Sequence, residues 1–211
     1  VELMDEHASA KGRALDLGCA VGRTTFDLSR TFSKVTGLDF SQAFIDAANV
    51  LKSNGRLDYQ RLETGQFSTP MVASVADEID RDKIDFVVGD AMDLADIPAL
   101  AENGPYDAIL LSNLMCRLTT PAACLTQFTA DDTYIGKGGI LVFASPNTWM
   151  EQYTDPDLFL DGGSSEETLA KLGSLLPGFT QMHEEDLPFM IREHRRKYEY
   201  IVSQVSVWRK D

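Results

Sequence analysis

The feature that most constrains this chain is a glycine turn between an apolar run and a helical pattern near its N-terminus. The run from Ala14 to Leu17 stops at Gly18, and a second glycine follows at Gly22. The apolar positions then recur at helical spacing, at Val21, Thr25, Leu28 and Phe32. This pattern predicts a strand, a turn and a helix. Because glycines let the backbone approach a ligand closely and the start of a helix offers unpaired N–H groups, we expect a nucleotide-like ligand here.

The spacing of the glycines indicates which ligand fits. A dinucleotide fingerprint needs G-x-G-x-x-G, whereas here three residues separate Gly18 from Gly22, and Ala20 stands where a middle glycine is expected. The turn is therefore a poor match to a pyrophosphate site. Cys19 is interpreted as a small filler in the same turn. We count Gly18, Cys19, Ala20 and Gly22 among the cofactor-binding residues.

Two acids flank this turn. Asp39 ends the next predicted strand, where its carboxylate can accept both hydroxyls of a ribose, and Phe40 directly after it is a further candidate cofactor-binding residue. Asp16 lies two residues before Gly18, facing a place where a cation can sit. An acid before such a glycine turn and another acid after the second strand resemble the S-adenosylmethionine (SAM) site of class I methyltransferases. The alternative is a structural turn in some other α/β protein.

Composition limits the class of protein. With 211 residues, 44% of them hydrophobic and 25% charged, the chain is expected to form one globular domain over residues 1–211. No apolar run approaches 18 residues and no signal peptide is visible, so we expect no membrane association. The three cysteines lack metal-type spacing, which favours a reducing cytoplasm and predicts no metal site.

The net charge of −14 bears on the partner. Such a charge repels phosphate backbones, which argues against a DNA or RNA methyltransferase. We therefore expect a small-molecule, amino-acid-like substrate and no nucleic acid. The sequence indicates no particular oligomeric state.

Two segments depart from a minimal α/β pattern. Residues 56–82 are longer than the usual connection between elements, and they predict an inserted β-hairpin or lid around Thr64-Gly65-Gln66. Residues 1–10 form a short helical pattern without an initiator methionine. We expect an N-terminal lead-in to be missing.

Two further predicted strands deliver polar residues at their ends. Ile84–Gly89 is followed by Asp90 and Ala91, and Tyr106–Leu111 is followed closely by Asn113. In open α/β sheets, ligands bind outside the carboxyl ends of the strands. We expect Asn113 to face both cofactor and substrate. Asp90 is expected either to bind the cofactor or to be a plain capping residue.

The remaining pattern alternates between β and α units. A second helix is predicted with a buried stripe of Phe44, Ala47, Ala48 and Leu51. The chain ends in two β-rich segments, Phe179–Pro188 and Tyr198–Trp208, with a basic cluster at residues 192–197 between them. Alternating units that end in two strands predict a doubly wound sheet.

Four stretches resemble one family more narrowly than the class does. It is the methyltransferase domain at the C-terminus of ovothiol synthase, together with its stand-alone relatives, the 4-mercaptohistidine (5-thiohistidine) N1-methyltransferases. The likeness runs from about residue 11 to residue 209, without any sulfoxide-synthase portion. The first stretch is specific only for the class, whereas the last two are unusual. The stretches are Ala14–Arg23, Val35–Ser41, Asp186–Glu193 and Ser203–Arg209.

The resemblance implies a fold, a cofactor and a reaction. The fold is a Rossmann-like, mostly parallel seven-stranded sheet in the order 3-2-1-4-5-7-6, with an antiparallel last strand. The reaction is methylation of the imidazole ring nitrogen of 5-thiohistidine in ovothiol biosynthesis, with S-adenosylhomocysteine (SAH) as the other product. Asp90 is implied to hold the adenine amino group, with Ala91 against the ring. The residues carried over to the SAM site are Asp16, Gly18, Gly22, Asp39 and Asp90.

The acceptor must be oriented, because the sulfur of thiohistidine is a rival nucleophile. Asn113 is the candidate catalytic residue, on a ring N–H. An arginine is expected on the carboxylate and an aromatic side chain against the ring. The candidate substrate-binding residues are Arg117, Trp149, Tyr153, Arg192, Arg195 and Arg196. The alternatives are a solvated basic face for the arginines and ordinary packing for the two aromatic residues.

Three functions stay open on the sequence alone. The first is the thiohistidine N-methyltransferase, and the second is another small-molecule N-, O- or S-methyltransferase, since a fold does not fix a function. The third is a non-catalytic SAM-binding subunit. A turnover assay with SAM and histidine-like acceptors distinguishes the three.

Overall fold

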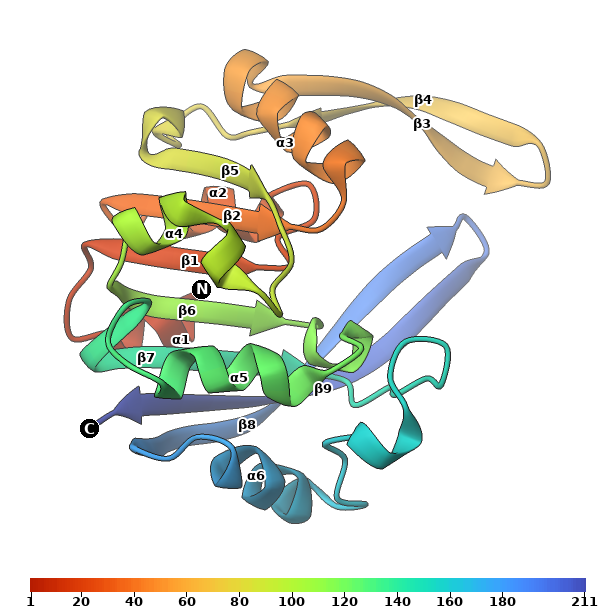
Figure 1. Ribbon diagram of the computed structural model, residues 1–211. Coiled ribbons are helices and arrows are strands. Elements are labelled where there is room, and N and C mark those ends of the chain that lie inside the picture. Colours follow the sequence, from red (N-terminus) through yellow and green to blue (C-terminus); the bar gives the residue numbers. More distant parts are fainter.

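A seven-stranded sheet with helices on both faces carries a separate two-stranded sheet at one side (Figure 1). The computed structural model describes residues 1–211. The main sheet consists of β1 (Arg13–Leu17), β2 (Lys34–Asp39), β5 (Ile84–Val88), β6 (Tyr106–Ser112), β7 (Ile135–Ser145), β8 (Phe179–His194) and β9 (Lys197–Lys210). The small sheet consists of β3 (Arg56–Thr64) and β4 (Phe67–Ser74). The α-helices are α1 (Glu2–His7), α2 (Arg23–Leu28), α3 (Gln42–Asn54), α4 (Pro98–Glu102), α5 (Pro121–Thr129) and α6 (Ser165–Ser174). Short 3₁₀ turns are η1 (Arg81–Lys83), η2 (Leu94–Asp96), η3 (Met115–Arg117) and η4 (Pro156–Leu158).

The main sheet has the predicted topology. Its strands lie in the order β5-β2-β1-β6-β7-β9-β8. Neighbouring strands from β5 to β7 are parallel, whereas β9 is antiparallel to both β7 and β8. Counted within this sheet alone, the order is 3-2-1-4-5-7-6, so the predicted doubly wound fold is confirmed. The parallel strands carry their carboxyl ends to one edge of the sheet, which we call the carboxyl edge.

Both faces of the sheet are covered, as the apolar runs of its strands require. Ala108 and Leu110 of β6 pack with residues of α1 and α2 on one face. Ile109 and Leu111, the alternate residues of the same strand, pack with residues of α4, α5 and α6 on the other face. Figure 1 shows α4 and α5 in front of the strands. This period-two alternation separates two apolar clusters on opposite sides of the sheet.

Helix α3 begins and ends at the predicted residues but buries a different stripe. The Ser41 side chain accepts a hydrogen bond from the Phe44 N–H, and Gly55 ends the helix in the left-handed region. Phe44, predicted to be buried, is 47% exposed. The buried residues are Ile45, Ala48 and Leu51. Leu51 belongs to a small apolar cluster beside β5. Ile45 and Ala48 precede Leu51 at intervals of three residues and face inward with it, so Phe44 faces outward.

Two hairpins project beyond the carboxyl edge (Figure 1). The inserted arm is the antiparallel pair β3–β4, within residues 56–82. The C-terminal arm is the outer part of β8–β9, residues 187–203. Its strands were predicted to end at Pro188 and to begin at Tyr198, but β8 continues to His194 and β9 begins at Lys197. Pairs such as Phe189 opposite Ile201 continue the ladder, so the basic cluster forms the end of a hairpin and not a linker.

Truncation of Phe128 tests the packing of α5 on the sheet. Phe128 is fully buried in the larger apolar cluster. We expect Phe128→Ala to lower the free energy of unfolding by about 3–5 kcal/mol, because the apolar contacts are lost and a cavity remains. Urea denaturation followed by circular dichroism measures the change. Thr126 of the same helix is exposed and supplies the matched control. Thr126→Ala should change the free energy of unfolding by less than about 0.5 kcal/mol. Equal effects of the two substitutions contradict this packing.

Candidate functional site

The glycine turn after β1 is held by backbone hydrogen bonds and tight packing. Gly18 and Gly22 have φ of +75° and +89°, in the left-handed region. The N–H groups of Gly18 and Cys19 donate to the Leu38 carbonyl at 2.8 and 3.0 Å. A Cβ on Gly22 would lie 2.5 Å from Cζ of Phe86. Both backbone conformation and space therefore require glycine at position 22.

Asp39 connects this turn to the start of α3. Its Oδ2 accepts a hydrogen bond from the Ala20 N–H at 2.8 Å, and its Oδ1 accepts one from the Ser41 N–H at 2.9 Å. Ala20 has φ of +48°, which is unusual for a residue with a side chain, and this bond helps to hold it there. A carboxylate oxygen has more than one acceptor site, so both oxygens of Asp39 can still accept from ligand hydroxyls.

A cavity of about 490 Å³ opens at the carboxyl edge beside this turn. Six of the predicted site residues line it: Gly18, Asp39, Phe40, Asp90, Ala91 and Arg117. Sequence reasoning missed six others: Leu38, Gly89, Met92, Leu114, Leu118 and Thr119. Each of these lies within two residues of a predicted site residue, so proximity in the sequence to those residues was the available signal. The cavity combines apolar walls with two carboxylates, which is the usual character of a small-molecule site.

Asp90 presents one free carboxylate oxygen at this cavity. Its Oδ1 accepts a hydrogen bond from the Met92 N–H at 2.8 Å, whereas Oδ2 has no partner. The carbonyl of Ala91 accepts from the Gln127 side chain at 2.9 Å, which fixes the segment after β5. Asp90 therefore both caps a turn and offers an acceptor, so the two interpretations of this residue are compatible.

Asp16 lies beneath the turn and does not line the cavity. It is 2% exposed, and its Oδ2 accepts a hydrogen bond from the Thr25 hydroxyl at 2.7 Å. Burial raises the pKa of Asp16 to about 6, although the bond from Thr25 acts in the opposite direction. A hydrogen bond from the Thr25 backbone also lowers the pKa. A buried carboxylate is suited to a cationic partner.

The cysteines are packing residues in this structure. Cys19, Cys116 and Cys124 are buried and form no disulfide. Burial raises the pKa of the Cys19 thiol, and the nearby carboxylates of Asp16 and Asp39 raise it further. Burial also raises the pKa of Cys124 to about 12. Neutral thiols at these positions agree with the interpretation of Cys19 as a filler of the turn.

Asn113 lies at the carboxyl end of β6 but outside the lining of the cavity. It has φ of +55°, and its N–H donates to the Ala144 carbonyl at 2.7 Å. Its side-chain oxygen lies 3.4 Å from the hydroxyl of Ser203, which is buried in β9. The next residue, Leu114, lines the cavity. Asn113 thus stands between the cavity and the C-terminal hairpin, and its catalytic role stays a prediction.

The structure brings Arg117 and Tyr153 together. The Arg117 guanidinium lies 5.2 Å from the centre of the Tyr153 ring, which is a cation–π distance. Its Nη1 also donates to the carbonyls of Cys116 and Thr148, at 3.0 and 2.8 Å. Arg117 therefore ties the segment after β7 to the wall of the cavity. Tyr153 is 40% exposed and does not itself line the cavity.

Trp149 lies elsewhere. Its ring stacks on Phe159 at 5.3 Å between centroids and packs against the larger apolar cluster. It lines a separate cavity of about 40 Å³ together with Leu169 and Leu172 of α6. Its Nε1 is buried without a hydrogen-bond partner. These contacts fit the packing alternative for Trp149, and its contact with substrate stays a prediction.

The three predicted arginines of the basic cluster differ in environment. Arg192 pairs with Glu63 of the inserted arm, with 2.6 Å between Nη2 and Oε2. Arg61 pairs with the other oxygen of the same carboxylate at 2.9 Å. Arg195 and Arg196 form the exposed turn of the C-terminal arm. The structure thus gives Arg192 a buried acidic partner that the sequence did not reveal, and leaves the other two in solvent.

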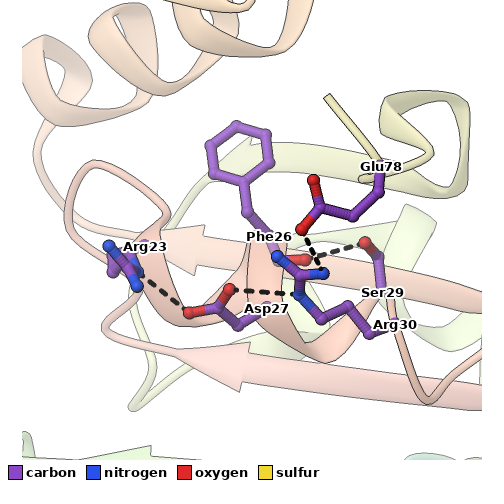
Figure 2. A network of polar contacts seen from close by, with 6 residues as sticks. All are labelled: Arg23, Phe26, Asp27, Ser29, Arg30 and Glu78. Atoms are coloured by element: carbon purple, nitrogen blue, oxygen red, sulfur yellow. Dashed lines mark hydrogen bonds and ion pairs between the residues drawn. The ribbon is translucent and has the colours of Figure 1, made fainter. Parts of the chain in front are cut away.

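A second cavity, of about 280 Å³, lies beside the helix that follows the glycine turn. Val21, Phe26 and Leu51 are among its apolar lining residues. Figure 2 shows the polar network at its rim, in which Asp27 pairs with two arginines and one of these also pairs with a glutamate. Its ion pairs are Arg23–Asp27, Arg30–Asp27 and Arg30–Glu78. Such exposed pairs are worth about 0–1 kcal/mol each, so this network mainly orients α2 against residues 73–79.

Comparison with known proteins identifies the family. Residues 15–131 match the family described as "Methyltransferase domain". A stretch of 77 residues is 34% identical to a ubiquinone biosynthesis O-methyltransferase of Nitrosococcus oceani. This stretch covers 35% of the chain and 33% of the relative, so the match spans about a third of that curated protein.

Solved structures show the same fold at low sequence identity. The N-methyltransferase NodS of Bradyrhizobium japonicum in complex with SAH superposes with a TM-score of 0.59 at 14% identity, over 99% of this chain and 83% of that one. A SAM-dependent methyltransferase of Methanosarcina mazei superposes with a TM-score of 0.61 at 14% identity, over 100% and 97% of the two chains. At such identities the likeness concerns the fold alone.

The chain belongs to the methyltransferase domain family. Its doubly wound sheet and the cavity at the carboxyl edge define it as a class I, SAM-dependent methyltransferase domain. No helix of the structure is long and apolar enough to cross a membrane. No group of three or more His, Cys, Asp or Glu side chains is arranged to hold a metal ion.

The buried Asp16 predicts a pH dependence of stability. Its pKa is about 6 in the folded chain against 3.8 for the ordinary group, so the folded state binds this proton more tightly. The contribution of Asp16 to the free energy of unfolding therefore rises as pH falls from 6 to 4, by about 2 kcal/mol. Asp16→Asn removes this titration. We expect the stability of the variant relative to the wild type to be highest at pH 7 and to fall by about that amount towards pH 4.

Urea unfolding of both proteins at pH 4, 5, 6 and 7 measures this difference. Asp46→Asn, at an exposed position of α3, supplies the control, because it leaves the buried carboxylate of Asp16 in place and should not reproduce the pH profile of Asp16→Asn. A constant difference for Asp16→Asn contradicts the raised pKa.

Proposed function

We propose that this methyltransferase transfers a methyl group from SAM to the imidazole ring nitrogen of 5-thiohistidine, as in ovothiol biosynthesis. The observation that carries the proposal is the cavity with two carboxylates, Asp39 and Asp90, at the carboxyl edge of the sheet. The proposed identity of the acceptor rests on the resemblance of the unusual stretches Asp186–Glu193 and Ser203–Arg209. These stretches lie in β8 and β9, and Ser203 contacts Asn113 beside the cavity.

The residues around the cavity fit SAM. Asp39 can accept the ribose hydroxyls, and the free oxygen of Asp90 can accept the adenine amino group. The side chains of Met92, Leu114 and Leu118 provide an apolar surface for the adenine ring. Asp16 fits as the partner of the cationic amino group of the methionine part, because it is a carboxylate held beneath the glycine turn. When bound, SAM supplies an electrophilic methyl group on a sulfonium.

The chain's own contribution to the reaction is positioning. A neutral ring nitrogen is already nucleophilic near neutral pH, so no strong base is needed. Its lone pair forms the new bond to the methyl carbon while the carbon–sulfur bond breaks in line, and the sulfonium becomes a thioether. Correct placement of the two groups is worth an effective molarity of about 10⁵–10⁸ M.

Selectivity for nitrogen over sulfur depends on how the acceptor is oriented. We propose that Asn113 contacts the ring N–H and that Arg192 contacts the carboxylate. Tyr153, which is held by Arg117 at the cavity wall, is the better placed of the two aromatic candidates to flank the ring. Arg195 and Arg196 are exposed and contribute charge at a distance.

A second candidate is another small-molecule methyltransferase. The 34% identity with a ubiquinone biosynthesis O-methyltransferase, over 77 residues, favours it as the alternative. A hydroxyl acceptor needs a base to remove its proton. The non-catalytic SAM-binding subunit is the third candidate, and it predicts cofactor binding without turnover of any acceptor. In all three cases the net charge of −14 disfavours a nucleic-acid substrate.

Cofactor binding is the first test. We expect the chain to bind SAM and SAH but not NAD in isothermal titration calorimetry. Asp39→Ala should weaken SAM binding by about 1–3 kcal/mol, because the ribose hydroxyls lose their acceptor. The exposed Asp46→Ala should leave affinity unchanged. Thermal melting followed by circular dichroism checks that both variants fold, since Asp39 also holds the turn. Tight NAD binding, or full SAM affinity in the folded Asp39→Ala variant, would contradict the assignment of this cavity to SAM.

The position of methylation is the second test. We expect the ring nitrogen nearer the side chain of 5-thiohistidine to be methylated. Histidine should be a poor acceptor because it lacks the thiolate that offsets the charge on the methylated ring. Fragmentation mass spectrometry of the product distinguishes nitrogen from sulfur methylation. A product methylated on sulfur, or equal rates with histidine, would argue for a different acceptor.

A further inference from the structure

The two arms meet at a compact cluster of charges. The Glu63 carboxylate accepts from Arg61 Nε at 3.0 Å and from Arg192 Nη2 at 2.6 Å. Glu63 belongs to the inserted arm and Arg192 to the C-terminal arm, 129 residues further along the chain. Burial works to raise the pKa of Glu63, but the two arginines outweigh it and hold the pKa below its ordinary value. The cluster therefore holds two cations and one anion, with a surplus of one positive charge.

Arg192 has donors that the protein does not use. Its side chain is only 25% exposed, so most of the guanidinium and its stem are removed from bulk water. A guanidinium has five N–H donors, and Arg192 donates through Nη2 to Glu63 and also hydrogen-bonds Tyr198. No nitrogen of Arg192 is buried without a partner, so its remaining donors are open to solvent and to an anionic ligand.

Aromatic side chains accompany the cations. Tyr198 lies directly opposite Arg192 in the β8–β9 ladder, so both project from the same face. Tyr59 lies two residues before Arg61 on β3 and shares its face by the alternation of a strand. Tyr59 and Tyr198 are 42% and 53% exposed. A cationic cluster with exposed aromatic neighbours suits a ligand that combines a carboxylate with a flat ring.

We propose that Arg61 and Arg192 anchor the carboxylate of the acceptor, with Glu63 as a positioning residue that holds both guanidinium groups. This inference rests on the proposed function and gives the inserted arm a role in acceptor specificity. Three features favour a carboxylate. Glu63 shows that a carboxylate fits between these arginines, the surplus charge matches one carboxylate, and planar guanidinium groups bind carboxylates through paired hydrogen bonds.

The test compares an acceptor with its carboxamide. Calorimetry with 5-thiohistidine and its amide, in the presence of SAH, measures acceptor binding without turnover. We expect Arg61→Met and Arg192→Met to weaken binding of the acid about 10- to 100-fold and to change binding of the amide less than about threefold. Glu63→Gln keeps an acceptor oxygen for one of the two arginines and should weaken binding of the acid by less than tenfold.

Arg56→Met is the matched control, because Arg56 lies on the same strand in an exposed pair with Asp58. Arg56→Met should change the binding of neither the acid nor the amide. Affinity for SAH should stay within about twofold in every variant, and circular dichroism checks folding.

The outcomes separate this inference from the proposed function. If the wild type binds SAH and the acid, but Arg61→Met and Arg192→Met weaken acid and amide equally, the cluster is structural and the anchor is overturned. Equal binding of acid and amide by the wild type overturns it too. If the wild type binds neither SAH nor SAM, the proposed function is overturned. In that case the preference of the wild type for the acid over the amide still tests whether Arg61 and Arg192 bind a carboxylate.

Discussion

The hydrogen bond between the Ala20 N–H and the Asp39 carboxylate is the interaction on which the site depends. It joins the turn after the first strand to the end of the second, and the same carboxylate also fixes the start of α3 through Ser41. Ala20 occupies a left-handed conformation that few residues with side chains adopt. One side chain thus determines the shape of the turn, the direction of the following helix and one polar wall of the cavity.

Sequence reasoning predicted the parts of this site that depend on local rules. The glycine turn and the acids after β2 and β5 follow from periodicity, glycine spacing and the geometry of parallel sheets. The strand order was implied by the resemblance to class I methyltransferases. The buried stripe of α3 was wrong at Phe44, because helical phase depends on which distant residues receive it. The environment of Trp149 depends on Phe159 and α6, which no spacing reveals.

The arms show the same limit more clearly. The sequence marked residues 56–82 as an insertion and residues 192–197 as a basic cluster, but it did not join them. Their contact depends on one glutamate and two arginines that are far apart in the sequence and come together only in the folded chain. The chain has a net charge of −14, whereas this cluster of one carboxylate and two arginines has a net positive charge. A local surplus of positive charge attracts anionic ligands.

The most direct measurement of the central claim is a crystal structure of the chain with SAH. The account predicts that the adenosine part lies in the cavity of about 490 Å³, with the ribose hydroxyls within hydrogen-bond distance of Asp39 and the adenine amino group on Asp90. The amino group of the homocysteine part should approach Asp16. SAH bound at any other place, or adenosine turned away from both Asp39 and Asp90, would contradict the account.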